Sequence, residues 1–159
     1  DRDAFEPVKM GEALNSALAM MEPQLRQRKI TITRSIPDEP VVVMGDRVRI
    51  EQVIINLLRN AMDATEASGD PAIDILLAGG ETAMLTVRDN GHGIEDIENL
   101  FEPFYTTKQP GDGVGLGLAI SSGIVNDLGG RLTARNAVGG GAVFEMQLPI
   151  LPEETRAAE

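Results

Sequence analysis

Residues 46–63 have the sequence DRVRIEQVIINLLRNAMD, which predicts an amphipathic helix and organises the expected fold. Asp46 can cap the start of this helix with its side-chain oxygen. One face is apolar at helical spacing and consists of Ile50, Val53, Ile54, Leu57, Leu58 and Ala61. The opposite side carries a polar stripe of Gln52, Asn56, Arg59, Asn60 and Asp63.

Two residues of the polar stripe, Asn56 and Asn60, project from the same side because they are four positions apart. Asn is a weak helix former, since its amide competes for backbone hydrogen bonds. A solvated face is one explanation of the stripe. The other is a ligand that needs neutral oxygen donors, and amide carbonyls suit Mg²⁺.

The rest of the chain alternates between helical and strand patterns. A helix is expected at about residues 10–28, where Pro23 can kink it, and a third helix has the apolar positions Leu116, Ile120, Ile124 and Leu128 and ends at Gly129-Gly130. Strands are expected at 30–32, 41–44, 72–78, 82–89, 131–136 and 142–148, with a hairpin at Gly79-Gly80. Three helices and at least five strands predict a two-layer α/β sandwich with a mixed, mainly antiparallel sheet.

Composition limits the classes of function. The 159 residues, 42% of them hydrophobic and 25% charged, fit one globular domain, with a core at about 5–149 and polar tails. No segment is expected to span a membrane or to act as a signal peptide, and the absence of Cys excludes disulfides. The net charge of −11 argues against a nucleic-acid surface. An anionic ligand would therefore need a divalent cation, backbone N–H groups or a few bases.

The strand that ends at Asp89 directs a carboxylate toward the apolar side of the sheet. Leu85, Val87 and Asp89 share one face by alternation, and an unpaired buried charge is costly. Asp89 either caps the next turn or accepts a hydrogen bond from a buried donor such as the exocyclic amino group of a base. In the following Asn90-Gly91-His92-Gly93-Ile94, the glycines allow the backbone to approach a flat ligand, whereas His92 is expected to be exposed.

Residues 90–114 lack periodicity and are expected to form a long loop, which is typical of functional or disordered segments. Gly111-Asp112-Gly113-Val114-Gly115-Leu116-Gly117-Leu118 then runs into the third helix, where free N–H groups can hold phosphate. The segment lacks the Gly-Lys-Ser/Thr of a P-loop, and Leu stands where a dinucleotide fingerprint needs Gly. A flexible linker is the less favoured alternative, because a helix follows at once.

Together these segments resemble the ATP-binding domain of sensor histidine kinases, whose Bergerat fold is shared with gyrase, heat-shock chaperone and mismatch-repair ATPases. The resemblance covers about residues 46–149 and is closest to sensors of oxygen, nitrogen status or dicarboxylates. Its four motifs are an N box (Asn56-Leu57-Leu58-Arg59-Asn60-Ala61), a first glycine box (Asp89-Asn90-Gly91-His92-Gly93), an F box (Phe101-Glu102-Pro103-Phe104-Tyr105-Thr106-Thr107-Lys108) and a second glycine box (Gly113-Val114-Gly115-Leu116-Gly117-Leu118).

The resemblance implies a site for ATP and Mg²⁺. By position, Asn60 binds Mg²⁺, Asn56 assists at the phosphates and Asp89 binds the adenine amino group. Residues 95–114 would form a mobile lid anchored by Phe101 and Phe104. The other nucleotide-binding positions implied are Asp63, Gly91, Gly93, Ile94, Thr106, Thr107, Lys108, Gly113, Gly115, Leu116, Gly117 and Leu118.

Asp63 departs from the family pattern, because many histidine kinases have a Lys there that can touch a phosphate. Lys108 is the best substitute and a candidate catalytic residue beside Asn56 and Asn60, with Arg59 a poorer one. The superfamily's hydrolases place a Glu at the position of Asn56. Since Asn cannot act as a general base, its presence favours phosphoryl transfer over hydrolysis.

The expected function is transfer of the γ-phosphoryl group of ATP to a histidine on a separate dimerisation domain, absent from this chain, and then to a response-regulator aspartate. Alone, the chain is expected to be monomeric and cytoplasmic, to bind ATP but barely to turn it over, and to contact neither nucleic acid nor membrane; its parent can be a membrane-anchored sensor. The alternatives are a nucleotide-binding pseudokinase or interaction module, a gyrase-like ATPase and a serine kinase of the anti-sigma type.

Overall fold

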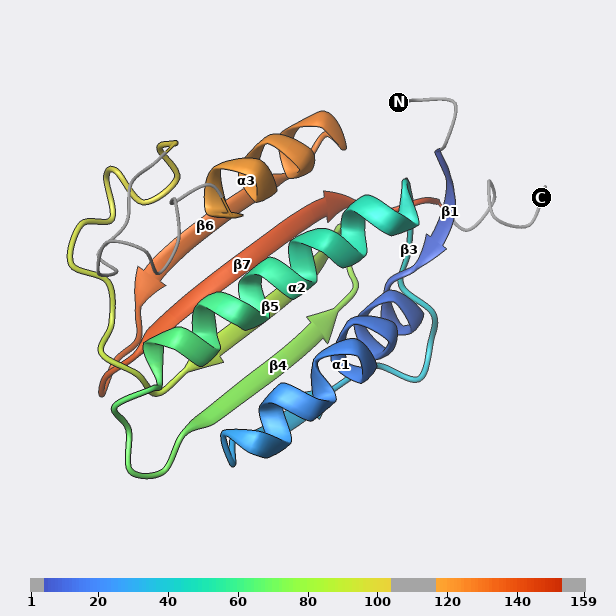
Figure 1. The fold of residues 1–159 in the computed structure, drawn as a ribbon. Coiled ribbons are helices and arrows are strands. Elements are labelled where there is room, and N and C mark those ends of the chain that lie inside the picture. Colours follow the sequence, from blue (N-terminus) through green and yellow to red (C-terminus); the bar gives the residue numbers. More distant parts are fainter. Residues whose placement is uncertain (1–4, 104–116, 153–159) are drawn as a thin grey trace.

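The computed structural model describes residues 5–103 and 117–152 (Figure 1). Three helices and seven strands occur in these residues. Their order is β1 (Glu6–Lys9), α1 (Met10–Gln27), β2 (Thr31–Ser35), β3 (Val42–Gly45), α2 (Arg47–Ala64), β4 (Ala72–Ala78), β5 (Thr82–Asp89), α3 (Gly117–Asp127), β6 (Arg131–Asn136) and β7 (Ala142–Pro149).

Five strands form the main sheet in the order β2-β4-β5-β7-β6. β2 pairs with β4 in parallel, and the other three pairings are antiparallel. The predicted mixed, mainly antiparallel sheet packed on three helices is therefore confirmed. β1 was not predicted; it pairs with β3 in a separate two-stranded sheet, and only Val8 of its four residues is buried, so it has no alternating pattern to detect.

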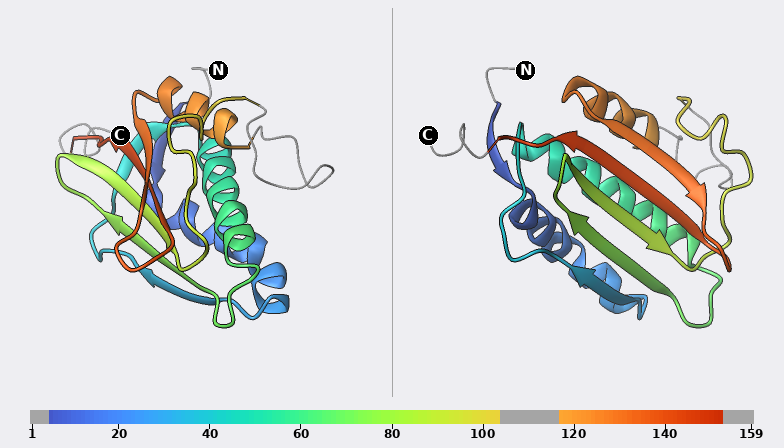
Figure 2. Two further views of the ribbon diagram at one scale, coloured as in Figure 1. Left: turned by 90° about the vertical axis from the view of Figure 1, so that its left-hand side faces the viewer. Right: turned by 180° about the vertical axis from the view of Figure 1, so that it is seen from behind.

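The three helices lie on one face of the main sheet (Figure 2). Alternate side chains of β5, namely Ala83, Leu85 and Val87, are buried under the helices, while the residues between them remain partly or fully exposed. The apolar positions predicted for the helix at residues 46–63 are all buried in α2. Such alternation is what one apolar face per element requires in a two-layer fold.

α1 follows its predicted course and is continuous through Pro23. It packs against α2 with a buried face that includes Leu14, Leu18, Met21 and Leu25. Among the helices of the described residues, none has the combination of length and hydropathy needed to cross a lipid bilayer.

The predicted apolar face of the third helix is partly wrong. α3 ends at Gly129-Gly130 as expected, with Gly129 at φ 80°, but Ile120 is 49% exposed. Of the other predicted positions, Leu128 is buried, Ile124 is partly buried against the core, and Leu116 lies outside the described residues. The buried face also contains Ser121 and Val125, which were not predicted. The sequence pattern missed this face because periodicity was read from apolar residues only, and the buried Ser121 is polar.

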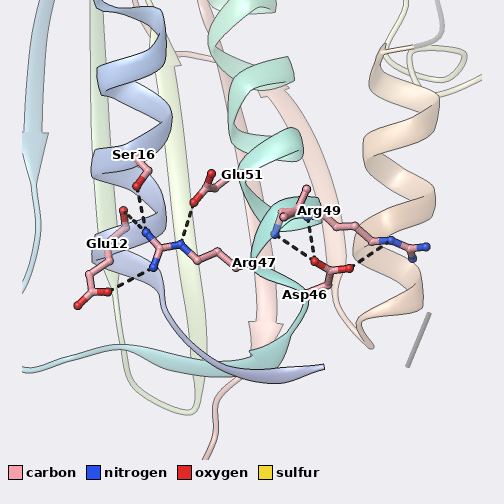
Figure 3. A network of polar contacts seen from close by, with 7 residues as sticks. Glu12, Ser16, Asp46, Arg47, Arg49 and Glu51 are labelled. Atoms are coloured by element: carbon pink, nitrogen blue, oxygen red, sulfur yellow. Dashed lines mark hydrogen bonds and ion pairs between the residues drawn. The ribbon is translucent and has the colours of Figure 1, made fainter. Parts of the chain in front are cut away.

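Polar contacts tie the start of α2 to α1 (Figure 3). Asp46 caps α2 as predicted, accepting hydrogen bonds from the N–H groups of Val48 and Arg49. The Arg47 guanidinium donates to Glu51 at 2.8 Å within α2, and to Ser16 at 3.0 Å and Glu12 at 3.4 Å in α1. These bonds fix the register between the two helices.

Candidate functional site

Asp89 is the last residue of β5 and lies on the sheet face that the helices cover. The residue is only 2% exposed. Oδ1 accepts hydrogen bonds from the backbone N–H of Gly91 at 2.9 Å and of Ala142 at 3.4 Å. Oδ2 is buried and has no hydrogen-bond partner among the described residues. The first alternative that the sequence left open is therefore confirmed, because Oδ1 caps the following turn. A bond from Oδ2 to the amino group of a base remains a prediction.

Burial raises the pKa of the Asp89 carboxyl above its usual value, because desolvation penalises the charged form. The hydrogen bonds from Gly91 and Ala142 act in the opposite direction, as does the charge of His92. An acceptor held in this way gains from any ligand that brings a hydrogen-bond donor to Oδ2.

Two glycines allow the backbone around Asp89 to pack closely. A Cβ on Gly141 would lie 1.9 Å from the carbonyl oxygen of Asp89, and one on Gly91 would lie 2.1 Å from the carbonyl oxygen of Ala64. Gly141 has φ 85°, a region that favours glycine. The backbone can therefore pack this closely only because both positions lack a side chain. At Gly91 the close contact with the end of α2 is enough to require glycine, whether or not a ligand binds.

The turn after Gly91 is held by Asn136, the last residue of β6. Its Oδ1 accepts from the N–H of Ile94 at 2.7 Å, and its Nδ2 donates to the carbonyl oxygen of Ile94 at 3.1 Å. Gly93 has φ 83°, and a Cβ there would lie 2.9 Å from the same Oδ1. His92 is exposed, as expected.

Asn56 in the middle of α2 faces α3. Its Nδ2 donates to the carbonyl oxygen of Gly117 at 3.2 Å and to Ser121 Oγ at 3.0 Å, while its Oδ1 accepts from Gln52 Nε2 at 3.1 Å. The interpretation of the stripe as a purely solvated face therefore fails for Asn56, because its amide is engaged with the next helix.

Asn60 and Asp63 continue the stripe toward the end of α2, and both are partly exposed. The Asn60 amide makes no hydrogen bond to any described residue. Asp63 forms an ion pair with Arg28, at 3.4 Å between Nη1 and Oδ1. A cation thus lies beside the position where the family pattern places a lysine.

Phe101 packs against the core, and its ring meets that of Phe144 edge to face with centroids 6.4 Å apart. This contact is consistent with the predicted role of Phe101 as an anchor, which itself stays a prediction. Seven predicted site residues lie outside the described residues: Phe104, Thr106, Thr107, Lys108, Gly113, Gly115 and Leu116. Their roles, and the lid at residues 95–114, remain predictions.

The described site residues gather at one end of the sheet. The second half of α2, the end of β5, the start of α3, the end of β6 and the start of β7 all meet there (Figure 1). The buried acceptor of Asp89 fits a flat base that carries an amino group. The partly exposed amides of Asn56 and Asn60 offer carbonyl oxygens of the kind that suits a hard cation.

Sequence reasoning missed Asn136, Gly141, Ala142 and Ser121. Gly139-Gly140-Gly141 was a visible signal of unusual backbone geometry between two predicted strands. Asn136 and Ser121 gave no local signal, because their partners lie far away in the sequence.

Comparison with known proteins identifies the class. Residues 45–152 match the family described as histidine kinase-, DNA gyrase B- and HSP90-like ATPases, and the chain belongs to this family. The C4-dicarboxylate transport sensor protein DctB of Pseudomonas aeruginosa is 38% identical over 98% of this chain and 28% of its own length. The chain therefore spans little more than a quarter of that relative.

Solved structures agree with this assignment. The nucleotide-free catalytic domain of histidine kinase ThkA matches with a TM-score of 0.82 and 30% identity, over 93% of this chain and 99% of that one. ThkA in complex with the response regulator TrrA matches with a TM-score of 0.79 and 30% identity, over 94% of this chain and 43% of that one. Full-length ShkA in complex with AMPPNP matches with a TM-score of 0.79 and 26% identity, over 92% of this chain and 31% of that one. The resemblance to histidine kinase ATP-binding domains is confirmed.

Proposed function

We propose that this chain binds Mg²⁺-ATP and passes its γ-phosphoryl group to a histidine on a separate dimerisation domain of the same parent protein. The bond between the γ-phosphorus and the bridging oxygen breaks, a bond from phosphorus to an imidazole nitrogen forms, and ADP leaves. A response-regulator aspartate then receives the group. The relatives named as sensors and the ThkA complex with TrrA support this sequence of partners.

The observation that carries the proposal is the buried Oδ2 of Asp89, which has no hydrogen-bond partner within residues 5–103 and 117–152. The 6-amino group of adenine can donate to this oxygen, whereas guanine presents a carbonyl oxygen at the same ring position. A carboxylate would repel that carbonyl, so the site selects adenine nucleotides. ShkA, which matches this chain in fold, was solved with the ATP analogue AMPPNP.

Phosphoryl transfer needs positioning and charge neutralisation more than covalent chemistry by the protein. Asn60 would hold Mg²⁺, which neutralises phosphate charge when bound, and Asn56 would assist at the phosphates. Asn56 has no proton-accepting group to activate a water molecule, which favours transfer over hydrolysis. Lys108 is the proposed cation at the γ-phosphate. Arg28 is a second cation near this end of α2, where it forms an ion pair with Asp63.

The first test is a calorimetric titration with ATP and with GTP, each with and without Mg²⁺, on the wild-type chain and on Asp89→Asn. The substitution keeps the shape of the side chain and puts a donor in the carboxylate's place. Loss of a buried bond to a charged acceptor should weaken ATP binding roughly tenfold to a hundredfold. Asp74→Asn is the matched control, because Asp74 sits on the exposed face of the neighbouring strand β4.

A second test adds the parent's histidine-bearing domain with γ-labelled ATP. Label on that histidine supports the proposal. Tight ATP binding without transfer would instead indicate a pseudokinase, and steady hydrolysis without the partner would indicate a gyrase-like ATPase. Equal affinity for ATP and GTP would contradict the role of Asp89.

A further inference from the structure

The Asn56 amide is held from two sides in an orientation that its surroundings dictate. The carbonyl oxygen of Gly117 can only accept a hydrogen bond, so the NH₂ group of Asn56 must face α3. Ser121 Oγ accepts the second N–H of the same group. Oδ1 therefore turns away from α3, toward Gln52 on the exposed stripe of α2.

Oδ1 is the atom of Asn56 that can approach Mg²⁺, because an amide nitrogen offers no lone pair to a cation. An amide rotated by half a turn would present its NH₂ group to the stripe and its oxygen to the Gly117 carbonyl. The usefulness of Asn56 thus depends on the contacts that prevent this rotation.

Ser121 is one of these contacts, although it belongs to none of the sequence motifs. It is fully buried in α3, on a face otherwise formed by apolar residues such as Val125 and Leu128. A buried hydroxyl without a partner is unfavourable, and an alanine would fill the same position at no such cost. The hydrogen bond from Asn56 therefore explains why a hydroxyl stands at this buried position.

We propose that Ser121 is a positioning residue that orients the Asn56 amide so that Oδ1 faces the Mg²⁺ of the bound nucleotide. This inference rests on the proposed function. It predicts that the hydroxyl matters for the Mg²⁺-dependent part of ATP binding, and not for the base pocket at Asp89, which lies on a different element.

The test compares dissociation constants for ATP with and without Mg²⁺ in the wild-type chain, Ser121→Ala and Ser122→Ala. Ser122 is the next residue of α3 and has no side-chain hydrogen bond to the described residues, so its variant controls for a changed helix. Loss of one orienting hydrogen bond should reduce the gain in affinity from Mg²⁺ about threefold to tenfold in Ser121→Ala. Mg²⁺-free affinity and the melting temperature should stay near wild type, and Ser122→Ala should match wild type throughout.

A second variant approaches the amide from the other side. Gln52→Ala removes the donor that occupies Oδ1 while leaving both α3 contacts in place. The increase in ATP affinity that Mg²⁺ gives to this variant should equal or exceed the increase in wild type. A general loosening of α2 would not produce this result.

An unchanged gain from Mg²⁺ in Ser121→Ala, in a wild-type background that binds Mg²⁺-ATP, would overturn this inference and leave the proposed function standing. An equal loss in Ser122→Ala would also overturn it. Failure of the wild-type chain to bind ATP at all would overturn the proposed function and this inference with it.

Discussion

Asn136 and Ile94 are forty-two residues apart in the sequence, yet they are joined by two hydrogen bonds of 2.7 and 3.1 Å. The Asn136 side chain satisfies both the N–H and the carbonyl group of Ile94, in the way a neighbouring strand would. The turn that follows Asp89 is thereby attached to the end of β6, and the backbone beside the proposed base pocket is held in place.

Asn136→Ala should lower the free energy of unfolding by about 1–3 kcal/mol, because two hydrogen bonds are lost and the Ile94 backbone loses its partners. ATP affinity should fall with it, since the turn becomes free to move. Urea denaturation and ATP titration measure the two effects. Asn126→Ala on the exposed side of α3 is the control, and an equal loss there would show that the clamp has no special role.

Gly141→Ala should be far more harmful than Gly139→Ala. Both residues have positive φ, 85° and 90°, so both substitutions carry a similar backbone strain of about 1–2 kcal/mol. At Gly141 the new Cβ would lie 1.9 Å from the Asp89 carbonyl oxygen, whereas at Gly139 no atom of the described residues lies within 4 Å. Chemical denaturation should therefore show an extra loss of several kcal/mol, about 3 or more, for Gly141→Ala. Similar stabilities of the two variants would contradict the close packing around Asp89.

The pH dependence of stability should carry the signature of Asp89. Burial raises the pKa of its carboxyl in the folded chain, so the folded state holds the proton more tightly than the unfolded state. Stability contributed by the protonated form is present below the unfolded pKa and is lost as the pH rises through the folded pKa. The unfolding free energy of wild type, compared with that of Asp89→Asn, should decline across this window. Parallel stability curves would contradict the desolvation of Asp89.

ATP binding should follow the opposite trend in the same pH window. The ionised carboxylate is the stronger acceptor for an amino group, so wild-type affinity should rise as Asp89 loses its proton. Asp89→Asn should lack that dependence. Titrations at increasing pH, starting near the ordinary aspartate pKa of about 4, would measure it.

Arg47→Ala should lower the melting temperature more than Arg26→Ala. Arg47 joins α2 to α1 through Ser16 and Glu12, whereas Arg26 pairs with Glu22 in its own helix and is exposed. Loss of the Arg47 contacts should loosen the packing of the two helices, and part of the difference should disappear at high salt. Equal melting temperatures for the two variants would show that the network in Figure 3 does not contribute to helix packing.

Local patterns in the sequence determined the elements and much of the site. The periodicity of Ile50, Ile54 and Leu57 with the Asp46 cap predicted α2, and alternation placed Leu85, Val87 and Asp89 on one buried face. These signals survive in a single sequence because helix and strand repeats depend on residues a few positions apart. The four motifs, each continuous in the chain, then identified the family.

Only the tertiary structure decided which polar groups meet. Ser121 faces Asn56, sixty-five residues earlier, in place of the apolar Ile120 that periodicity favoured. Asn136 hydrogen-bonds to Ile94, and Gly141 lies directly against the backbone of Asp89. One oxygen of Asp89 is buried with no hydrogen-bond partner in the part of the chain that the structure describes. Each of these contacts joins segments that are distant in the chain, so no local repeat encodes it. They form because the packing of α2, α3 and the sheet edge brings those segments to one end of the molecule.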